Sequence, residues 1–405
     1  MRTSGIRRSR VRTIASAGLG VLLVGIASVP AHAESIRAQQ WYLDTMHAEE
    51  IWQISKGDGV TVAVIDSGVE KDNPDLVGRV LDGKDFAPDQ PGDEFTDYTG
   101  HGTGMAGLIA GTGARDGGNG AFGLAPKAKI LPVRVPGIEA GQGSMKDSDD
   151  EFNRVVPPAI RYAADAGAKV INISLGAGAG SQGLTDAVKY ALDKGALVFA
   201  SVGNSADKGN AVEYPGATPG VVGVGAIDQK LTRVKNSQYG PQVDLVAPGK
   251  DTVHACGGGT GLCKSTGTSD ATALASAAAA LIWAEHPDWT NNQVLKVMLN
   301  TVAAPDDGGG RNDFIGYGAI RPLRALKTPG DPGLADVRPI QDLPAAQTPS
   351  PSTAPVATSS TPAPAPQADE AAGGSRTGLW IGLGVGAAVL LGAAVAVPVL
   401  RSRRR

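Results

Sequence analysis

Six short apolar runs that alternate with helix-like segments constrain the fold of this chain most strongly. Each run is bounded by Gly, Asp, Asn or Pro, which is typical of strands buried on both faces. The six runs are Val60–Ile65, Lys129–Val135, Val170–Leu175, Ala196–Ala200, Val221–Ala226 and Val243–Ala247. The helix-like segments are Gly102–Ala110, Phe152–Ala166, Leu184–Lys194 and the Ala-rich Thr268–Glu285. This alternation predicts an α/β fold of three layers, with a mostly parallel central sheet covered by helices on both faces.

The first 33 residues have the organisation of a secretory signal peptide. A basic segment that ends at Arg12 precedes the apolar Ile14–Val29, and Ala31-His32-Ala33 is a small-residue cleavage pattern. We expect Sec export with cleavage after Ala33. Two alternatives stay open, namely twin-arginine export through Arg7-Arg8 and an uncleaved anchor, for which the apolar run is short.

The C-terminal end predicts a membrane anchor. Residues 378–400 carry no charge and would form a helix ~35 Å long, enough to cross a hydrocarbon core of ~30 Å. The arginine-rich residues 401–405 are expected to stay in the cytoplasm, so the domain would lie outside a cytoplasmic membrane that the chain crosses once. Gly378, Gly382 and Gly386 have the spacing of close helix packing, or reflect chance in a Gly-rich chain.

These ends divide the chain into five segments. We expect a signal peptide at residues 1–33, a globular domain at 34–327, a linker at 328–377, a transmembrane helix at 378–400 and a basic tail at 401–405. Within the linker, Pro344–Pro366 consists almost only of Pro, Ala, Ser, Thr, Gln and Val, which bury too little apolar area to fold. A flexible coil of ~50 residues spans roughly 40 Å.

The charge of the chain is distributed unevenly. The whole chain has 37 Lys and Arg against 40 Asp and Glu, a net charge of −3. Five arginines lie in residues 1–33 and four in 401–405, which leaves 28 basic against 40 acidic side chains in residues 34–377, a net of −12. An acidic domain argues against nucleic-acid binding, which needs a basic patch. The acidic stretch Asp147–Glu151 favours basic substrates or partners, or, as the simpler interpretation, is a solvated loop.

The two cysteines, Cys256 and Cys263, are predicted to form a disulfide. An exported chain meets an oxidising environment, and the bridge would close a Gly-rich loop just before Thr268. A metal site is a poor alternative, because His254 is the only partner ligand nearby. No ligand pattern for calcium is present in the sequence.

Three short motifs carry the candidate chemistry. Asp66-Ser67-Gly68 ends the first strand, where open α/β sheets place reactive groups. His101-Gly102-Thr103-Gly104 starts a helix, and Gly267-Thr268-Ser269 opens the Ala-rich helix. Taken singly, each has a plainer explanation: a turn-capping Asp, a surface His in a Gly turn and a helix-capping Ser. Together they supply a carboxylate, an imidazole and a hydroxyl, the three groups that this form of acyl transfer needs.

In this chain order, the three motifs resemble those of the subtilisin-like serine peptidases. The resemblance runs from about Trp41 to Leu326. The matching segments are Val62–Gly68, His101–Gly107, Gly123–Ala128, Val170–Gly176, Ala200–Asn204 and Gly267–Ser269. Several independent motifs in the right order make the resemblance specific.

The resemblance implies a role for each candidate site residue. Asp66 would orient His101, His101 would act as general base and acid, and Ser269 would be the nucleophile. Asn204 would supply the side-chain half of the oxyanion hole, with the backbone N–H of Ser269 as the other half. The segment that would pair with the substrate backbone and wall the side-chain pocket consists of Ser174, Leu175 and Gly176. We expect no cofactor and no metal, and calcium binding stays open.

Two positions depart from the family pattern. Asp270 follows the nucleophile where Met, Phe or Tyr is common, and Ala273 stands where Pro is common. A carboxylate suits the first turn of a helix. Beside the nucleophile, however, its charge opposes the formation of an oxyanion, so we expect modest turnover and a gain on replacement of Asp270 by Met.

The short segment between Ala33 and Trp41, the C-terminal span and the arginine tail are similar to those of the mycosins. These are membrane-anchored subtilisin-like peptidases associated with type VII secretion, and the segment leaves no room for the long propeptide of secreted subtilisins. The resemblance implies a membrane-tethered serine endopeptidase that processes secreted proteins beside type VII membrane components. Two alternatives are a general extracellular degradative protease and a structural subunit of a secretion complex with dispensable catalysis.

Overall fold

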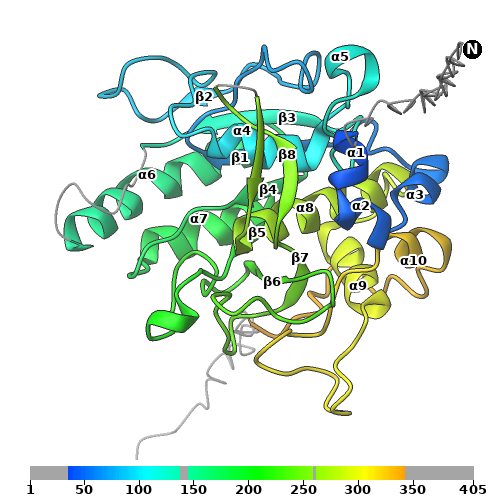
Figure 1. Ribbon diagram of the computed structural model, residues 1–405. Coiled ribbons are helices and arrows are strands. Elements are labelled where there is room, and N and C mark those ends of the chain that lie inside the picture. Colours follow the sequence, from blue (N-terminus) through cyan, green and yellow to red (C-terminus); the bar gives the residue numbers. More distant parts are fainter. Residues whose placement is uncertain (1–34, 137–144, 259–260, 343–405) are drawn as a thin grey trace, which may run out of the picture. The chain divides into compact units, whose positions relative to one another are not determined.

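The computed structural model describes residues 35–136, 145–258 and 261–342, and its centre is a seven-stranded sheet (Figure 1). All neighbouring strands run parallel, in the order β2-β3-β1-β4-β5-β6-β7. The strands are β1 (Thr61–Asp66), β2 (Lys84–Asp85), β3 (Lys129–Arg134), β4 (Val170–Ile173), β5 (Leu197–Ser201), β6 (Val222–Ile227) and β7 (Leu245–Pro248). The expected parallel sheet is confirmed, and the six apolar runs correspond to all of its strands except the two-residue β2.

Helices cover both faces of this sheet. Their bounds are α1 (Ile36–Gln39), α2 (Trp41–Thr45), α3 (Ala48–Ile54), α4 (His101–Ala110), α5 (Arg115–Gly118), α6 (Met145–Asp165), α7 (Gln182–Asp193), α8 (Thr268–Glu285), α9 (Asn291–Thr301) and α10 (Pro322–Lys327). Local capping explains two of the helix starts. The Ser181 hydroxyl accepts from the backbone N–H of Leu184 at α7, and Thr290 forms a capping box with Gln293 at α9.

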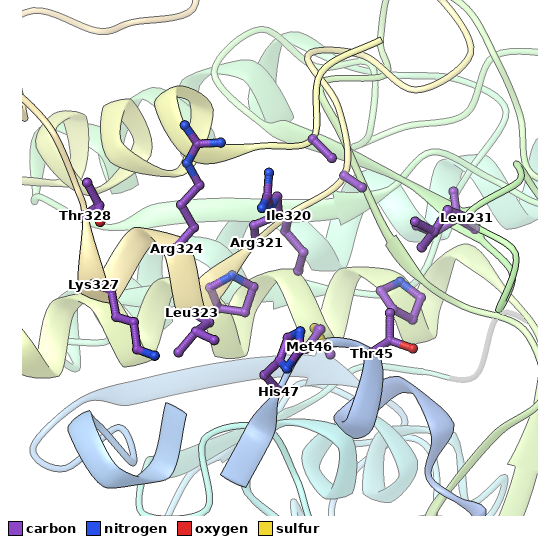
Figure 2. Close-up of a pocket in the computed structure, with 15 residues that line it drawn as sticks. Thr45, Met46, His47, Leu231, Ile320, Arg321, Leu323, Arg324, Lys327 and Thr328 are labelled. Carbon is purple, nitrogen blue, oxygen red and sulfur yellow. The ribbon is translucent and has the colours of Figure 1, made fainter. Parts of the chain in front are cut away.

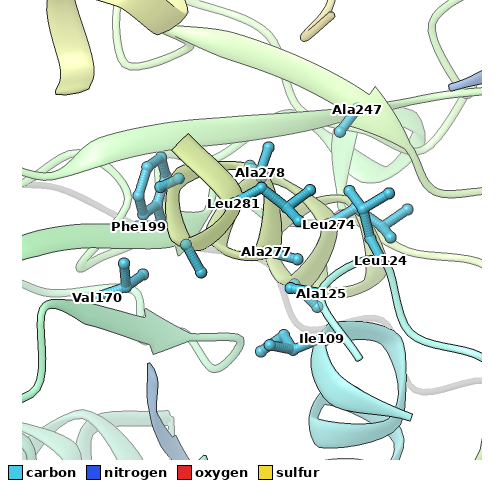
Figure 3. Close-up of a cluster of buried hydrophobic side chains, with 14 of the residues drawn as sticks. Ile109, Leu124, Ala125, Val170, Phe199, Ala247, Leu274, Ala277, Ala278 and Leu281 are labelled. Carbon is cyan, nitrogen blue, oxygen red and sulfur yellow. The ribbon is translucent and has the colours of Figure 1, made fainter. Parts of the chain in front are cut away.

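Two apolar layers meet the sheet from opposite sides. Alternate residues of each strand point to opposite faces, so Val62 and Val64 belong to one cluster while Ala63 and Ile65 belong to the other. The first cluster contains α4, α8 and α9, and the second contains α6 and α7. Figure 3 shows α8 crossing the first face, with Leu274 and Leu281 of α8 in the same cluster as Phe199 of β5. The predicted three-layer arrangement is therefore present.

A two-stranded antiparallel hairpin stands apart from the main sheet. It consists of β8 (Thr252–Ala255) and β9 (Leu262–Ser265), neither of which the apolar pattern predicts. Cys256 and Cys263 are bonded as a disulfide at its end, which confirms the predicted pairing. The hairpin leads directly into α8, so the disulfide lies a few residues before the candidate nucleophile.

The folded domain continues beyond the linker boundary expected at residue 328. Residues 328–342 lie against α9, where the amides of Gln293 and Asn300 donate to the backbone oxygens of Gly333 and Asp331. Ile340 is buried in the core. These side chain–backbone hydrogen bonds fix a stretch whose composition resembles a linker, so the domain extends at least to Asp342.

Several predicted segments lie outside the described residues. They are the signal peptide, the Pro-rich part of the linker, residues 378–400 and the arginine tail. Within the described ranges, which end at residue 342, none of the helices combines the length and the apolar character that a membrane crossing needs.

Candidate active site

The candidate site residues converge at the carboxyl edge of the parallel sheet. Asp66 is the last residue of β1, Ser174 follows β4, and Asn204 follows β5. The strand order places β3 and β4 on either side of β1, a reversal of the kind at which open α/β sheets form their binding crevices. His101 begins α4 and Ser269 lies in the first turn of α8, so both helices start at this edge.

Asp66 and His101 form a direct pair. Nδ1 of His101 lies 2.8 Å from Oδ1 of Asp66, which also accepts from the backbone N–H of Ser67 at 2.8 Å. The Asp66 side chain is fully buried, whereas that of His101 is 37% exposed. Burial alone would lower the pKa of His101, but the charge and hydrogen bond of Asp66, with Asp270 and Asp97 further away, raise it to about 9. The imidazole is thus held in one orientation while its ring reaches solvent.

Two glycines allow the two motifs to approach this closely. Gly68 has φ +117°, and a Cβ atom built on it would lie 2.2 Å from the carbonyl oxygen of Thr96. A Cβ atom built on Gly102 would lie 2.1 Å from the carbonyl oxygen of Gly68. The chain therefore needs glycine beside both Asp66 and His101.

Asp97 organises the turn before His101, a role that the sequence did not reveal. Its Oδ1 accepts from the Ser67 hydroxyl at 2.8 Å and the Gly100 N–H at 2.9 Å, and its Oδ2 accepts from the Thr103 N–H at 2.8 Å. One buried carboxylate thus ties the end of β1 to the first turn of α4. The segment Asp97–Gly100 stands directly before His101 in the sequence, but spacing alone does not distinguish such a carboxylate from a solvated one.

Ser269 is held against the chain segment that follows β4. Its Oγ donates to the carbonyl oxygen of Ser174 at 3.1 Å, and the Ser174 hydroxyl donates to the carbonyl oxygen of Ser269 at 3.2 Å. No hydrogen bond joins Ser269 Oγ to the His101 imidazole in the described part of the chain. Catalytic hydrogen bonds often form only with substrate present, so this geometry does not argue against a role for either residue.

The Asn204 amide has a fixed orientation beside Ser269. Its Oδ1 accepts from the backbone N–H of Thr268 at 2.9 Å, and the residue is exposed. With the oxygen bound there, the Nδ2 group remains available to donate. Behind the site, Asn172 donates to the Ser174 hydroxyl at 3.1 Å and accepts from Ser276 of α8 at 3.0 Å.

Asp270 does not face the site as the sequence-based argument expected. Its side chain is 2% exposed and accepts from the Ser265 hydroxyl at 2.7 Å, with His254 Nε2 at 3.8 Å. The carboxylate therefore points into the core instead of standing beside a developing oxyanion. His254, which the sequence offers as a ligand near the two cysteines, lies in β8 with a side chain that is 4% exposed.

The hydrogen bonds of His254 and Asp270 indicate how many protons the two side chains carry. His254 Nδ1 lies 2.7 Å from the Ala255 carbonyl oxygen, which requires a proton on Nδ1. His254 Nε2 and Asp270 Oδ1 both contact the Ser265 hydroxyl, whose single proton cannot serve both. One more proton is thus shared by the imidazole and the carboxyl. Burial lowers the pKa of His254 and raises that of Asp270, which favours the neutral forms.

A separate apolar pocket lies away from these residues. It has a volume of about 500 Å³ and lies between the α2–α3 turn and α10 (Figure 2). Met46 and Leu323 contribute to its lining, and Arg321 and Arg324 extend from α10 and the residue before it. None of the candidate site residues lines it. Among the described residues, no cluster of three His, Cys, Asp or Glu side chains is placed to hold a metal ion.

Known proteins match this chain over most of the described domain. The model of the subtilase family (Peptidase S8) matches residues 57–318. Thermitase of Thermoactinomyces vulgaris is 37% identical over 212 residues, which are 52% of this chain and 71% of thermitase. The solved structure of MycP3 protease from the type VII (ESX-3) secretion system has 31% identity and a TM-score of 0.61, over 71% of this chain and 88% of that one. A chain of the periplasmic assembly from the ESX-5 inner membrane complex has 27% identity and a TM-score of 0.64, and the match covers 83% of this chain and 92% of that chain.

The family model covers well over half of the chain, and the chain belongs to the subtilase family of serine peptidases. Within that family, the similar solved structures include the mycosins MycP1 and MycP3 of type VII secretion. The sequence-based resemblance to both groups is therefore confirmed.

Proposed function

We propose that this protein is a membrane-anchored serine endopeptidase in which Asp66, His101 and Ser269 form the catalytic triad. The observation that carries the proposal is the 2.8 Å contact between Asp66 and His101 at the sheet edge where Ser269 begins α8. A buried carboxylate that holds a solvent-accessible imidazole beside a helix-start serine is the arrangement that acyl transfer needs.

Each residue has a defined role in the proposed reaction. His101 takes the proton of Ser269 Oγ as that oxygen attacks the scissile carbonyl, and it later donates the proton to the leaving amine. Asn204 Nδ2 and the Ser269 N–H stabilise the oxyanion, together with the positive end of α8. A substrate strand pairs along Ser174, Leu175 and Gly176, of which Gly176 is exposed. Water then attacks the acyl-enzyme, with His101 again as base.

The proposed setting is the outer face of the cytoplasmic membrane, beside a type VII secretion complex. The similarity to MycP3, from a type VII secretion system, supports this setting. So does the similarity to a chain of a periplasmic assembly. The substrates would be secreted proteins, which the enzyme would cleave at few sites. Residues 378–400 would anchor the chain, with 401–405 in the cytoplasm.

A structural role in a secretion complex is the second candidate function. It is favoured by the match of 83% of this chain to a component of an assembled membrane complex. Catalysis would then be dispensable for secretion. General extracellular degradation is the remaining alternative, and bulk proteolysis distinguishes it from limited processing.

One substitution separates these functions. Ser269→Ala is expressed in the cells that produce the protein, and bulk proteolysis, processing of secreted proteins and secretion itself are compared with wild type. Ser181→Ala, which removes a hydroxyl at the start of α7 outside the site, is the control. We expect processing to disappear while bulk proteolysis changes little. If secretion persists in Ser269→Ala, the protein supports secretion without catalysis. Unchanged processing contradicts the proposed function.

A further inference from the structure

Glu213 lies between the two segments that flank the proposed substrate position. A Cβ atom built on Gly176 would lie 3.0 Å from Glu213 Oε2, so the carboxylate touches the backbone of the segment that follows β4. A Cβ atom built on Gly203 would lie 2.6 Å from Glu213 Cδ, so the same carboxylate touches the segment that follows β5. Gly203, which has φ +105°, is required there, and a larger residue at position 176 would press on the carboxylate.

Hydrogen bonds fix Glu213 in this position. Tyr214 and Ala177 exchange two backbone hydrogen bonds of 2.8 Å, which attach the chain around Glu213 to the segment around Gly176. Glu213 Oε1 accepts from the Ser205 hydroxyl at 3.1 Å and from Gln238 Nε2 at 2.6 Å. One carboxylate oxygen is thus held by the protein, and the other is directed towards Gly176.

The second oxygen has no partner of its own. Within the described ranges, Glu213 forms no ion pair, and Oε2 accepts no hydrogen bond. The residue is half-buried, and burial raises its pKa while its hydrogen bonds oppose that change. A partly buried carboxylate without a counter-ion costs free energy unless a cation approaches it. Its place in a crevice where a substrate would lie suggests that the cation comes from the substrate.

We propose that Glu213 determines substrate specificity by binding a Lys or Arg side chain of the residue whose carbonyl is cleaved. This inference rests on the proposed function, which places that carbonyl at Asn204 and the substrate backbone along Ser174–Gly176. With the backbone and carbonyl held there, the side chain of the same residue enters the space between the two segments and meets Glu213 Oε2. A guanidinium or ammonium group donates there in a charge-assisted hydrogen bond.

The start of α6 adds negative charge next to this position. Asp149 Oδ1 accepts from the backbone N–H of Gly178 at 2.7 Å, two residues beyond Gly176. The acidic stretch Asp147–Glu151 therefore lies in the first turns of a helix that contacts the substrate segment, and it is not a free loop. Its charges attract basic peptides towards Glu213.

The test uses four peptides that differ at one residue: Arg, its neutral isostere citrulline, Leu or Glu before the cleaved bond. We expect wild-type kcat/KM to be highest for Arg, and Glu213→Gln to lower it for Arg roughly 10- to 100-fold while changing it little for citrulline. Glu285→Gln removes a negative charge at the far end of α8, and as the control it should leave the preference for Arg unchanged. Fluorophosphonate labelling of each variant checks the catalytic groups independently.

A binding measurement keeps the inference separate from the proposed chemistry. Ser269→Ala, which cannot turn over by the proposed mechanism, should bind the Arg peptide more tightly than the citrulline peptide, and Glu213→Gln in that background should remove the difference. If fluorophosphonate does not label the protein, the proposed function is contradicted. The binding comparison still tests the role of Glu213, because it does not depend on turnover. Equal binding of the two peptides, or an Arg preference that survives Glu213→Gln, overturns the inference.

Discussion

The described domain contains two Asp–His pairs with opposite surroundings. Asp66 contacts His101 directly at 2.8 Å, and the His101 side chain is 37% exposed at the edge of the sheet. Asp270 approaches His254 only to 3.8 Å, with the Ser265 hydroxyl between them, and both side chains are almost completely buried. Asp270 directly follows Ser269 in the first turn of α8, whereas Asp66 ends β1.

The difference shows that contact with a carboxylate and burial have opposite effects on the pKa of a histidine. Direct contact with an ionised carboxylate overcomes burial and raises the pKa of His101 to about 9. Where the imidazole is itself buried and reaches the carboxylate through a hydroxyl, burial dominates and lowers the pKa of His254. The first pair can exchange a proton with a reacting group, whereas the second joins the β8–β9 hairpin to α8.

The largest effect should follow from removal of the exposed imidazole. His101→Ala removes the proposed general base, and we expect kcat to fall by about 10⁶-fold, the loss found in subtilisin itself. The change should also lower the temperature of unfolding, because it leaves the fully buried Asp66 carboxylate without its imidazole partner. Activity assays and unfolding curves of the same preparations check both statements. A variant that retains a tenth of wild-type turnover would contradict the role of His101.

Removal of Asn204 should have the next largest effect on turnover. Asn204→Ala removes one oxyanion donor, and the known subtilisin case gives a loss of about 10²–10³ in kcat. KM should change little, because the interaction forms only in the transition state. Asn300→Ala removes a surface amide that bonds Asp331, and it serves as the control. A rise in KM at unchanged kcat would place Asn204 in substrate binding instead.

The buried pair should affect stability more than catalysis. His254→Ala removes the buried imidazole that contacts the Ser265 hydroxyl and the Ala255 carbonyl oxygen, and we expect the free energy of unfolding to fall by about 2–4 kcal/mol. His47→Ala, whose side chain is 61% exposed, should change it by less than about 0.5 kcal/mol. Denaturant titrations compare the two. Equal stability of the two variants would mean that His254 has no structural role.

The smallest effect concerns the charge of Asp270 on the pH profile. The base form of His101 is the neutral imidazole, so kcat/KM should rise with pH through about 9. Asp270 raises the His101 pKa only to the extent that it is ionised, and burial favours its neutral form, so Asp270→Asn should move the midpoint to lower pH by much less than about one unit. The stability that the Asp66–His101 pair contributes is fully present below the ordinary His pKa of 6.5 and is lost as the pH rises through about 9. A midpoint that moves upward would contradict the assignment.

The sequence predicted the parts of the fold that depend on local patterns. Alternating apolar runs predicted six of the seven strands of the parallel sheet, and the motif order placed Asp66, His101 and Ser269 at one edge of the sheet. Residues with roles set by distant contacts were missed. Asp97 is buried by its bonds to Ser67 and Thr103, and Glu213 is positioned through the pairing of Tyr214 with Ala177.

Two errors have the same physical origin. Asp270 follows Ser269 in the sequence, but the first turn of α8 directs its side chain towards Ser265 and the core. Residues 328–342 have the composition of a linker, yet backbone oxygens of Gly333 and Asp331 accept from side chains of α9. In both cases the outcome depends on partners far away in the chain, which composition and spacing do not encode.

The central claim is that Ser269 is activated by the Asp66–His101 pair, and covalent labelling tests it most directly. Purified protein is treated with a fluorophosphonate across a series of pH values, and the modified residue is identified by peptide mapping. We predict a label on Ser269 alone, at a rate that rises as His101 loses its proton and that is lost in His101→Ala. Absence of a label, a label on another residue, or a rate unaffected by His101→Ala would contradict the account.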